Sequence, residues 1–218
     1  MKTQSALLLF QYWNRLRNGA MAPQRTAIEP SDIREVLSQT FILKEEASTG
    51  EMDFRLAGTA ISSFFGRQLR STPLRQLFQH QHRAIVSRLL RNCYQESSVV
   101  LLGLNAATRN ERKSDLEVLL MPLQAEPEGN HILGCIIPHE HAFWHGLEPV
   151  TSLDLTSIRV LDPDREFLYL ANRPEIVMPP SVMPSESNLE LTGTKSVAQF
   201  LIIQGGKSST TASSITKR

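Results

Sequence analysis

The stretch MDFRLAGTAISSFFGRQL, residues 52 to 69, decides the fold because a strand pattern changes to a helix pattern within it. Apolar and polar residues alternate in its first part, and side chains alternate between the two faces of an extended strand. Met52, Phe54 and Leu56 are therefore expected on one face of a strand, in the core.

The second part of this stretch has the residues of a short helix between two glycines. Gly58 breaks the strand alternation, and Thr59 after it can serve as the N-cap of a helix that runs to Phe65. Gly66 follows where a helix commonly stops, because glycine tolerates the left-handed conformation of a C-cap. Phe64 and Phe65 are expected in the core beside the strand.

Outward from this junction, the chain shows further strand and helix patterns. Upstream, residues 40 to 46 form a strand pattern, and the turn-forming residues 48 to 50 join it to the strand at Met52 in a hairpin. Downstream, apolar residues at helical spacing predict a helix from 81 to 95 with a basic outer face. Three more strands are expected, at 99 to 107, 113 to 123 and 131 to 138. The order of these elements indicates an α+β fold with an antiparallel sheet.

The composition of the chain changes along its length and predicts four parts. We expect an N-terminal amphipathic helix in residues 1–20, a folded domain in 21–140, a C-terminal extension in 141–173 and a flexible tail rich in Pro, Ser and Thr in 174–218. The extension contains one more strand pattern, from Ser157 to Leu161, which could stand apart from the sheet.

The N-terminal helix, expected from Ser5 to Arg17, has a broad apolar face. Such a face is buried either against the chain's own sheet or against the same helix of a second copy. We predict the second arrangement, a homodimer. The residues of the predicted interface are Leu9, Tyr12, Trp13 and Leu16.

The composition is that of an ordinary globular protein. The 218 residues are 41% hydrophobic, and 23 basic residues nearly balance 22 acidic ones, so the net charge says little about partners. Cys93 and Cys135 lie in unlike contexts and imply no disulfide framework. No apolar run approaches the roughly 18 to 20 residues that cross a bilayer, and the N-terminal run is too short for a signal peptide. We therefore expect a cytoplasmic protein without membrane insertion.

Five segments follow one another along the chain: YWNRLR at 12–17, AIEPSDI at 27–33, FRLAGT with FFGRQL at 54–59 and 64–69, LEVLLMPL at 116–123 and ILG at 132–134. In this order they resemble a bacterial family of short PAS-like proteins, long described as of unknown function. The resemblance covers about residues 9 to 138. It implies a five-stranded antiparallel sheet with helices across one face, and a cavity that other PAS domains use for cofactors, ligands or signalling contacts.

We therefore predict a sensory or regulatory protein that binds a small ligand or a protein partner and signals through protein–protein contacts. The ligand candidates are Arg55, Thr59 and Arg67, which flank the strand-to-helix junction. The sequence specifies no cofactor, and no arrangement of side chains in it supports a catalytic site.

The alternative is a nucleotide or nucleic-acid binding protein that uses the Arg-rich segment 55–91, which has no acidic residue. Guanidinium groups bind phosphate in bidentate fashion. Aromatic residues for base stacking are not interleaved with these arginines, so we favour a solvated helix face for Arg83, Arg88 and Arg91. Nucleic acid is therefore not the expected partner.

His139, His141 and His145 form the densest group of possible metal ligands. In a strand the first two share a face and in a helix the last two do, so either pair could hold zinc. The H-E-x-x-H spacing of zinc proteases is absent, and no cysteine is near. We therefore favour a solvated loop without a metal. His80 and His82 are expected as surface residues before the long helix.

Overall fold

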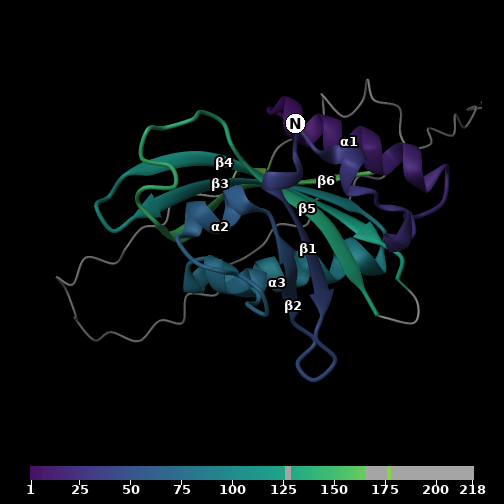
Figure 1. The fold of residues 1–218 in the computed structure, drawn as a ribbon. Coiled ribbons are helices and arrows are strands. Elements are labelled where there is room, and N and C mark those ends of the chain that lie inside the picture. Colours follow the sequence, from purple (N-terminus) through teal and green to yellow (C-terminus); the bar gives the residue numbers. More distant parts are fainter. Residues whose placement is uncertain (126–128, 165–175, 178–218) are drawn as a thin grey trace, which may run out of the picture. The chain divides into compact units, whose positions relative to one another are not determined.

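The computed structural model describes residues 1–125, 129–164 and 176–177. It is built on one antiparallel sheet with helices on both faces (Figure 1). The strands are β1 (Thr40–Glu45), β2 (Met52–Ala57), β3 (Val99–Thr108), β4 (Lys113–Leu123), β5 (His131–Pro138), β6 (Val150–Leu161) and β7 (Ile176–Val177). The helices are α1 (Gln4–Arg17), α2 (Thr59–Phe65) and α3 (His80–Gln95), with the short 3-10 helices η1 (Arg25–Ala27), η2 (Pro30–Ile33), η3 (Leu37–Gln39) and η4 (Leu74–Leu77).

The sheet has seven strands in the order β2-β1-β5-β4-β3-β6-β7, two more than the five predicted. Strand β6 falls within the segment assigned to a C-terminal extension, yet it pairs with β3 along nearly its whole length. Its register shifts at two places interrupt the alternation of apolar residues, which is why the sequence indicated only its final part. The predicted tail, 174–218, lies outside the described residues except for β7.

The two central strands are covered on both faces, which explains their nearly continuous apolar sequences. Every residue of β4 from Leu116 to Leu123 is buried, and so is every residue of β5 from His131 to Ile137. One face of the sheet, here the inner face, packs against α2, η4 and α3, and the outer face packs against α1. No helix in the described part of the chain is both long and apolar enough to span a membrane.

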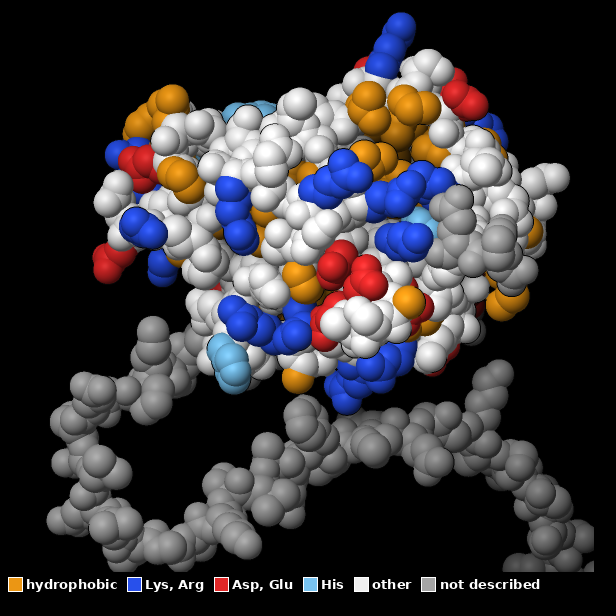
Figure 2. Space-filling model, turned by 60° about the horizontal axis from the view of Figure 1, so that its bottom comes forward, with side chains coloured by type: hydrophobic (Ala, Val, Ile, Leu, Met, Phe, Trp, Pro, Cys, Tyr) orange, Lys and Arg blue, Asp and Glu red, His pale blue; other side chains and the backbone are white. Residues whose placement is uncertain are grey.

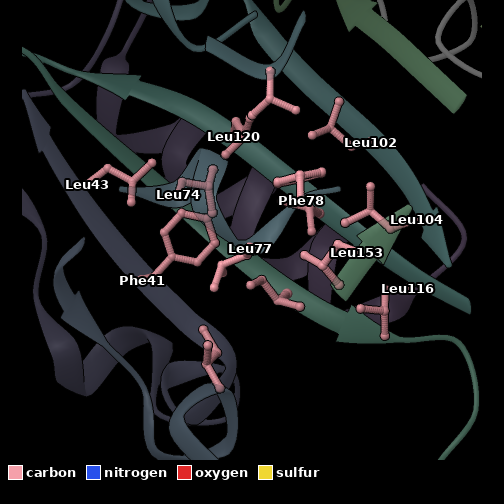
Figure 3. Packing of buried hydrophobic residues seen from close by; sticks show 14 of the residues in the cluster. Phe41, Leu43, Leu74, Leu77, Phe78, Leu102, Leu104, Leu116, Leu120 and Leu153 are labelled. Carbon is pink, nitrogen blue, oxygen red and sulfur yellow. The ribbon is translucent and has the colours of Figure 1, made fainter. Parts of the chain in front are cut away.

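Large apolar side chains fill the space between the inner face and the helices (Figure 3). They come from the sheet and from the segment around η4, and they converge on one another in the close view. Each of the ten labelled residues is at most 4% exposed. These residues are Phe41, Leu43, Leu74, Leu77, Phe78, Leu102, Leu104, Leu116, Leu120 and Leu153.

Helix α1 lies against the outer face of the sheet. Leu9 and Trp13 are completely buried and Tyr12 is nearly so. The indole N–H of Trp13 donates to the carbonyl oxygen of Pro122 at 2.8 Å, which ties the helix to β4. Of the four residues predicted for a dimer interface, only Leu16 keeps substantial exposure. The apolar face of α1 therefore packs on the chain's own sheet, and the homodimer stays a prediction.

A carboxylate from the sheet holds the start of α1. Glu117 of β4 is buried and accepts hydrogen bonds from the backbone N–H of Lys2 at 2.7 Å and from the hydroxyl of Thr3 at 3.0 Å. The first N–H groups of a helix lack partners within it, and the helix dipole favours a negative charge there. Since Thr3, the N-cap residue, makes no side-chain cap of its own, Glu117 stabilises this end of α1 from β4.

Replacing Glu117 with alanine is expected to lower the free energy of unfolding by about 1–2 kcal/mol, as the loss of a helix cap does. Urea denaturation measures the loss. Asp115→Ala is the control, because Asp115 is exposed on the same strand and its removal should change stability by less than about 0.5 kcal/mol. Equal losses in the two variants would contradict the role given to Glu117.

Strand β2 contains a bulge that reverses its alternation. Its register with β1 pairs Phe54 with Leu43 and Leu56 with Ile42, which leaves Arg55 as an extra residue. Leu56 consequently points away from the inner core and is 56% exposed. The prediction that Leu56 is a core residue is therefore wrong, whereas Phe54 is buried as predicted.

The two glycines of the junction have the geometric roles that the sequence indicates, with one correction. Gly58, not Thr59, is the N-cap of α2, and Thr59 is the first helical residue. A Cβ atom at Gly58 would lie 2.2 Å from the carbonyl oxygen of Ser38, so only glycine fits there. Gly66 ends the helix with a φ of 62°, a conformation that glycine adopts readily.

Candidate functional site

The three ligand candidates predicted from the sequence lie apart in the structure. Arg55 is the exposed bulge residue of β2, and Thr59 is exposed at the start of α2. Arg67, just after α2, lines a hollow that neither of the other two residues lines. Of the three candidates, Arg67 is thus the one that lines this hollow, and its role as a ligand contact stays a prediction.

The hollow beside Arg67, here called the Arg67 pocket, has a volume of about 590 Å³. It is formed where the end of α2, η4, the end of β3 and the start of β6 meet. Its volume falls within the roughly 300–1,000 Å³ that is typical of small-molecule sites. Its residues are Phe65, Arg67, Gln76, Leu77, Thr108, Arg109, Asn110, Glu148, Pro149, Val150 and Thr151.

The Arg67 pocket has an apolar floor and a polar rim. Phe65, Leu77 and Val150 are buried and belong to the core on the inner face of the sheet. The exposed polar side chains around them are Arg67, Gln76, Arg109, Asn110 and Thr151. A few polar groups above apolar walls are the usual composition of a ligand site, because apolar contact supplies affinity and the polar groups fix orientation.

Gly66 allows the close packing that forms one side of the pocket. A Cβ atom at this position would lie 2.6 Å from Cγ of Pro149. Because glycine has no Cβ, the end of α2 can approach the segment that leads into β6. Arg67 is thereby brought to the same hollow as residues 148–151.

The pocket carries a positive charge that its own carboxylate does not neutralise. Glu148 is ion-paired with Arg112 at 3.1 Å and accepts a hydrogen bond from the side chain of Asn110 at 3.2 Å. Among the residues that the structure describes, neither Arg67 nor Arg109 has a carboxylate within 4.0 Å. Two guanidinium groups at the rim are thus available to an anion.

Arg67 is a ligand candidate from the sequence, but Arg109, which lines the same hollow, is not. Arg109 lies in the turn between β3 and β4, far from Arg67 in the sequence. Turns commonly carry exposed polar residues, so a single arginine in one gives no signal of a site. Only the pairing of β3 with β6 brings this turn beside Pro149 and the end of α2.

The three histidines of the sequence PHEHAFWHG lie in the loop between β5 and β6. The rings of His141 and His145 have their centroids 6.5 Å apart. Nδ1 of His145 accepts from the backbone N–H of Ala142 at 3.4 Å, and Nε2 lies 3.1 Å from the hydroxyl of Ser114. Both ring nitrogens are therefore engaged. The described residues contain no group of three or more side chains that could hold a metal ion.

Stability should depend on pH through His145. Burial, and secondarily the neighbouring charge of His141, lower the pKa of His145 below its ordinary value of 6.5. The unfolded chain then binds more protons than the folded one below about pH 6.5, so the free energy of unfolding falls as the pH drops through the folded pKa. Protonation of Nδ1 also ends its hydrogen bond from Ala142.

We expect urea midpoints measured from pH 7.5 to pH 5.5 to fall more steeply for the natural chain than for His145→Gln. His80→Gln, which changes an exposed histidine, is the control and should keep the natural pH dependence. Identical pH profiles for the natural chain and His145→Gln would rule out this contribution.

The prediction that His82 is a surface residue before the long helix is wrong. It lies in the first turn of α3 and is buried. Its Nε2 lies 2.6 Å from the carboxylate of Asp154 on β6, so it links α3 to the sheet.

A family model described as a PAS domain matches residues 1–137, which is more than half of the chain. This protein belongs to the PAS domain family. PAS domains are in general sensory and ligand-binding signalling modules, and they are typically not enzymes. The family resemblance found in the sequence and the α+β fold predicted from it are both confirmed.

Two solved structures are similar to this chain at low sequence identity. A LOV protein of Rhodobacter sphaeroides is 16% identical, with a TM-score of 0.39 over 50% of this chain and 66% of that protein. An RNA-binding light-oxygen-voltage receptor is 12% identical, with a TM-score of 0.37 over 57% of this chain and 36% of the receptor. No curated protein matches the chain.

In this PAS domain the chain's own apolar side chains pack in the space between the inner face and the helices (Figure 3), and a hollow of about 220 Å³ lies beside α2, where Phe64, Leu116 and Ile136 are among its lining residues. The resemblance predicts a cavity there for a cofactor or ligand. The Arg67 pocket lies at the end of this space, and Phe65, Leu77 and Val150 belong both to the pocket and to the core. A ligand in the pocket would therefore contact the PAS core from outside.

Proposed function

We propose that this protein is a non-catalytic regulatory protein that binds a small ligand in the Arg67 pocket and signals the bound state to a protein partner. The observation that carries the proposal is the pair of arginines, Arg67 and Arg109, above an apolar floor in a hollow of about 590 Å³. An anion bound there would gain Coulomb attraction from the two guanidinium groups of the lining.

The residues at the floor of the pocket connect a bound ligand to the elements of the inner core. Phe65 belongs to α2, Leu77 to η4 and Val150 to β6, and all three pack in the inner core. A ligand that contacts them favours one arrangement of these elements over another, to the extent of its differential affinity for the two. A protein partner would bind differently to the two arrangements of α2 and η4 and would thereby respond to the ligand.

Catalysis is not part of the proposal. The pocket lining contains no histidine or cysteine, and its carboxylate, Glu148, is already held by Arg112 and Asn110. A general base needs a free acceptor within hydrogen-bond reach of the substrate proton. Binding alone is therefore the function that these side chains support.

Two arginines of the alternative, a nucleic-acid interface in segment 55–91, are engaged within the chain. Arg75 is ion-paired with Glu51, and Arg83 donates to the carbonyl oxygen of Phe78 at 3.1 Å. On the face shown in Figure 2, basic side chains occur in separate groups with acidic side chains between them. Electrostatic attraction to a phosphate backbone favours a basic stripe, which this arrangement does not provide.

A cytoplasmic location and a homodimer belong to the proposal through the resemblance to short bacterial PAS-like proteins. Since Leu9, Tyr12 and Trp13 face the sheet, a second copy would bind through other residues.

Native mass spectrometry of the full chain tests the proposed function. We expect the natively purified protein to carry a bound small molecule, and Gln76→Trp to lose it, because an indole at the rim would occupy the pocket. Gln95→Trp is the matched control, since Gln95 is exposed on α3 outside the pocket. Retention of the molecule by Gln76→Trp, or its absence from the natural chain, would contradict the proposal.

A further inference from the structure

We propose that, given a ligand in the Arg67 pocket as proposed above, this ligand is a small free dianion with an apolar group, namely a phosphate monoester. Charge, hydrogen-bonding capacity and the shape of the floor each restrict the class of ligand.

The charge of the pocket matches a dianion. Arg67 and Arg109 contribute two positive charges, while the charges of Glu148 and Arg112 cancel in their ion pair. A ligand with one carboxylate would neutralise only one guanidinium group, and the second positive charge would have no counter-charge. A phosphate monoester has a charge of about −1.5 to −2 at pH 7 and three acceptor oxygens, so its charge matches that of the two arginines in the lining.

Glu148 sets an upper limit on the negative charge of the ligand. It lines the pocket and is held in place by Arg112, Asn110 and, at 3.4 Å, the hydroxyl of Thr108. Because Arg112 is already engaged by Glu148, a ligand with further phosphate groups would carry negative charge that no remaining arginine of the pocket neutralises. The lining therefore favours one phosphate group over a chain of them.

The apolar floor requires a second part of the ligand. Phe65, Leu77 and Val150 offer one aromatic and two aliphatic side chains at the base of the hollow. Burying an apolar group there is favourable by about 25 cal/mol per Å². These three side chains are at most 5% exposed, and Pro149 is the exposed apolar residue of the lining. Inorganic phosphate or a compact dicarboxylate would leave the ring of Pro149 in contact with water, and a ring carried by the phosphate would cover it.

Isothermal titration calorimetry of the full chain with four probes tests the ligand class. Phenyl phosphate combines the dianion with a ring, benzoate has the ring with one charge, and inorganic phosphate and succinate have the charge without the ring. We expect phenyl phosphate to bind at least about tenfold more tightly than each of the others. Raising the salt concentration should weaken its binding.

Variants locate the interaction. Arg67→Ala and Arg109→Ala should each weaken the binding of phenyl phosphate by about tenfold or more, and Gln76→Trp should abolish it. Arg55→Ala and Arg88→Ala, which remove exposed arginines outside the pocket, should leave it unchanged within about twofold. Circular dichroism confirms that each variant is folded.

The outcomes separate the ligand class from the proposed function. Suppose that benzoate and phenyl phosphate bind equally tightly, that Arg67→Ala does not change their affinity and that Gln76→Trp abolishes their binding. This result would contradict a dianionic ligand but would keep the pocket as the binding site. If the Gln76→Trp variant bound all four probes as tightly as the natural chain does, the Arg67 pocket would not be the binding site. Sedimentation with phosphatidylcholine vesicles that contain phosphatidic acid tests the source, and binding lost in Arg67→Ala would assign a lipid headgroup in place of a free molecule.

Discussion

Replacing Trp13 with alanine is expected to lower the free energy of unfolding by about 3–5 kcal/mol, the range observed for removing a large buried aromatic side chain. Trp13 is completely buried between α1 and the sheet and stacks on Phe10 with ring centroids 6.1 Å apart. Its loss leaves both a cavity and an unpaired carbonyl oxygen at Pro122. Urea denaturation, followed by circular dichroism, measures the change.

Two controls separate the contributions of Trp13. Trp13→Phe keeps most of the buried ring but cannot donate to Pro122, so it should cost about 1–2 kcal/mol. Leu8→Ala changes a residue on the same helix that is 40% exposed, and it should cost less than about 1 kcal/mol. A Trp13→Ala variant with unchanged stability but half the molecular mass in light scattering would instead place Trp13 in a dimer interface.

Replacing Gly58 with alanine is expected to lower the free energy of unfolding by about 1–3 kcal/mol, because the added methyl group overpacks a closed site. The new Cβ would lie 2.2 Å from the carbonyl oxygen of Ser38 and 2.6 Å from that of Leu37. Both atoms belong to the backbone, so the segment before β1 must move. Thermal or urea unfolding measures the loss.

The neighbouring residue provides the control for Gly58. Thr59→Ala changes an exposed side chain at the first helical position, where it caps nothing, and the change in stability should stay within about 0.5 kcal/mol. If Thr59→Ala lowered the free energy of unfolding by about 1 kcal/mol and Gly58→Ala did not lower it, Thr59 would be the N-cap of α2 after all.

The regular parts of the fold could be predicted from the sequence because their patterns are local. The bounds of β4 and β5 agree with those predicted, and α3 begins one residue earlier than expected. Leu56 was misplaced because a bulge depends on the partner strand, here the pairing of Leu43 with Phe54, which no local alternation reveals. Two register shifts hid most of β6 in the same way.

The partner of α1 and the full lining of the Arg67 pocket could not be predicted from the sequence, since both depend on contacts between distant segments. The apolar face of α1 is equally compatible with a second copy and with the sheet. The choice depends on the outer face of β4, where Leu119 and Met121 are buried. Arg67 is selected from the sequence because it is a charged residue at the strand-to-helix junction. Arg109 lines the same pocket only because β6 brings Pro149 beside α2, a contact that the sequence does not reveal.

Amide spectra of the full chain, recorded by NMR, test most directly whether the Arg67 pocket is the ligand site. The natively purified protein is compared with the same protein after unfolding, removal of small molecules and refolding. We expect the differences to concentrate at residues 65–67, 76–77, 108–110 and 148–151. Identical spectra, or differences confined to residues away from the pocket such as Ile28, Ile42 and Leu56, would contradict this assignment.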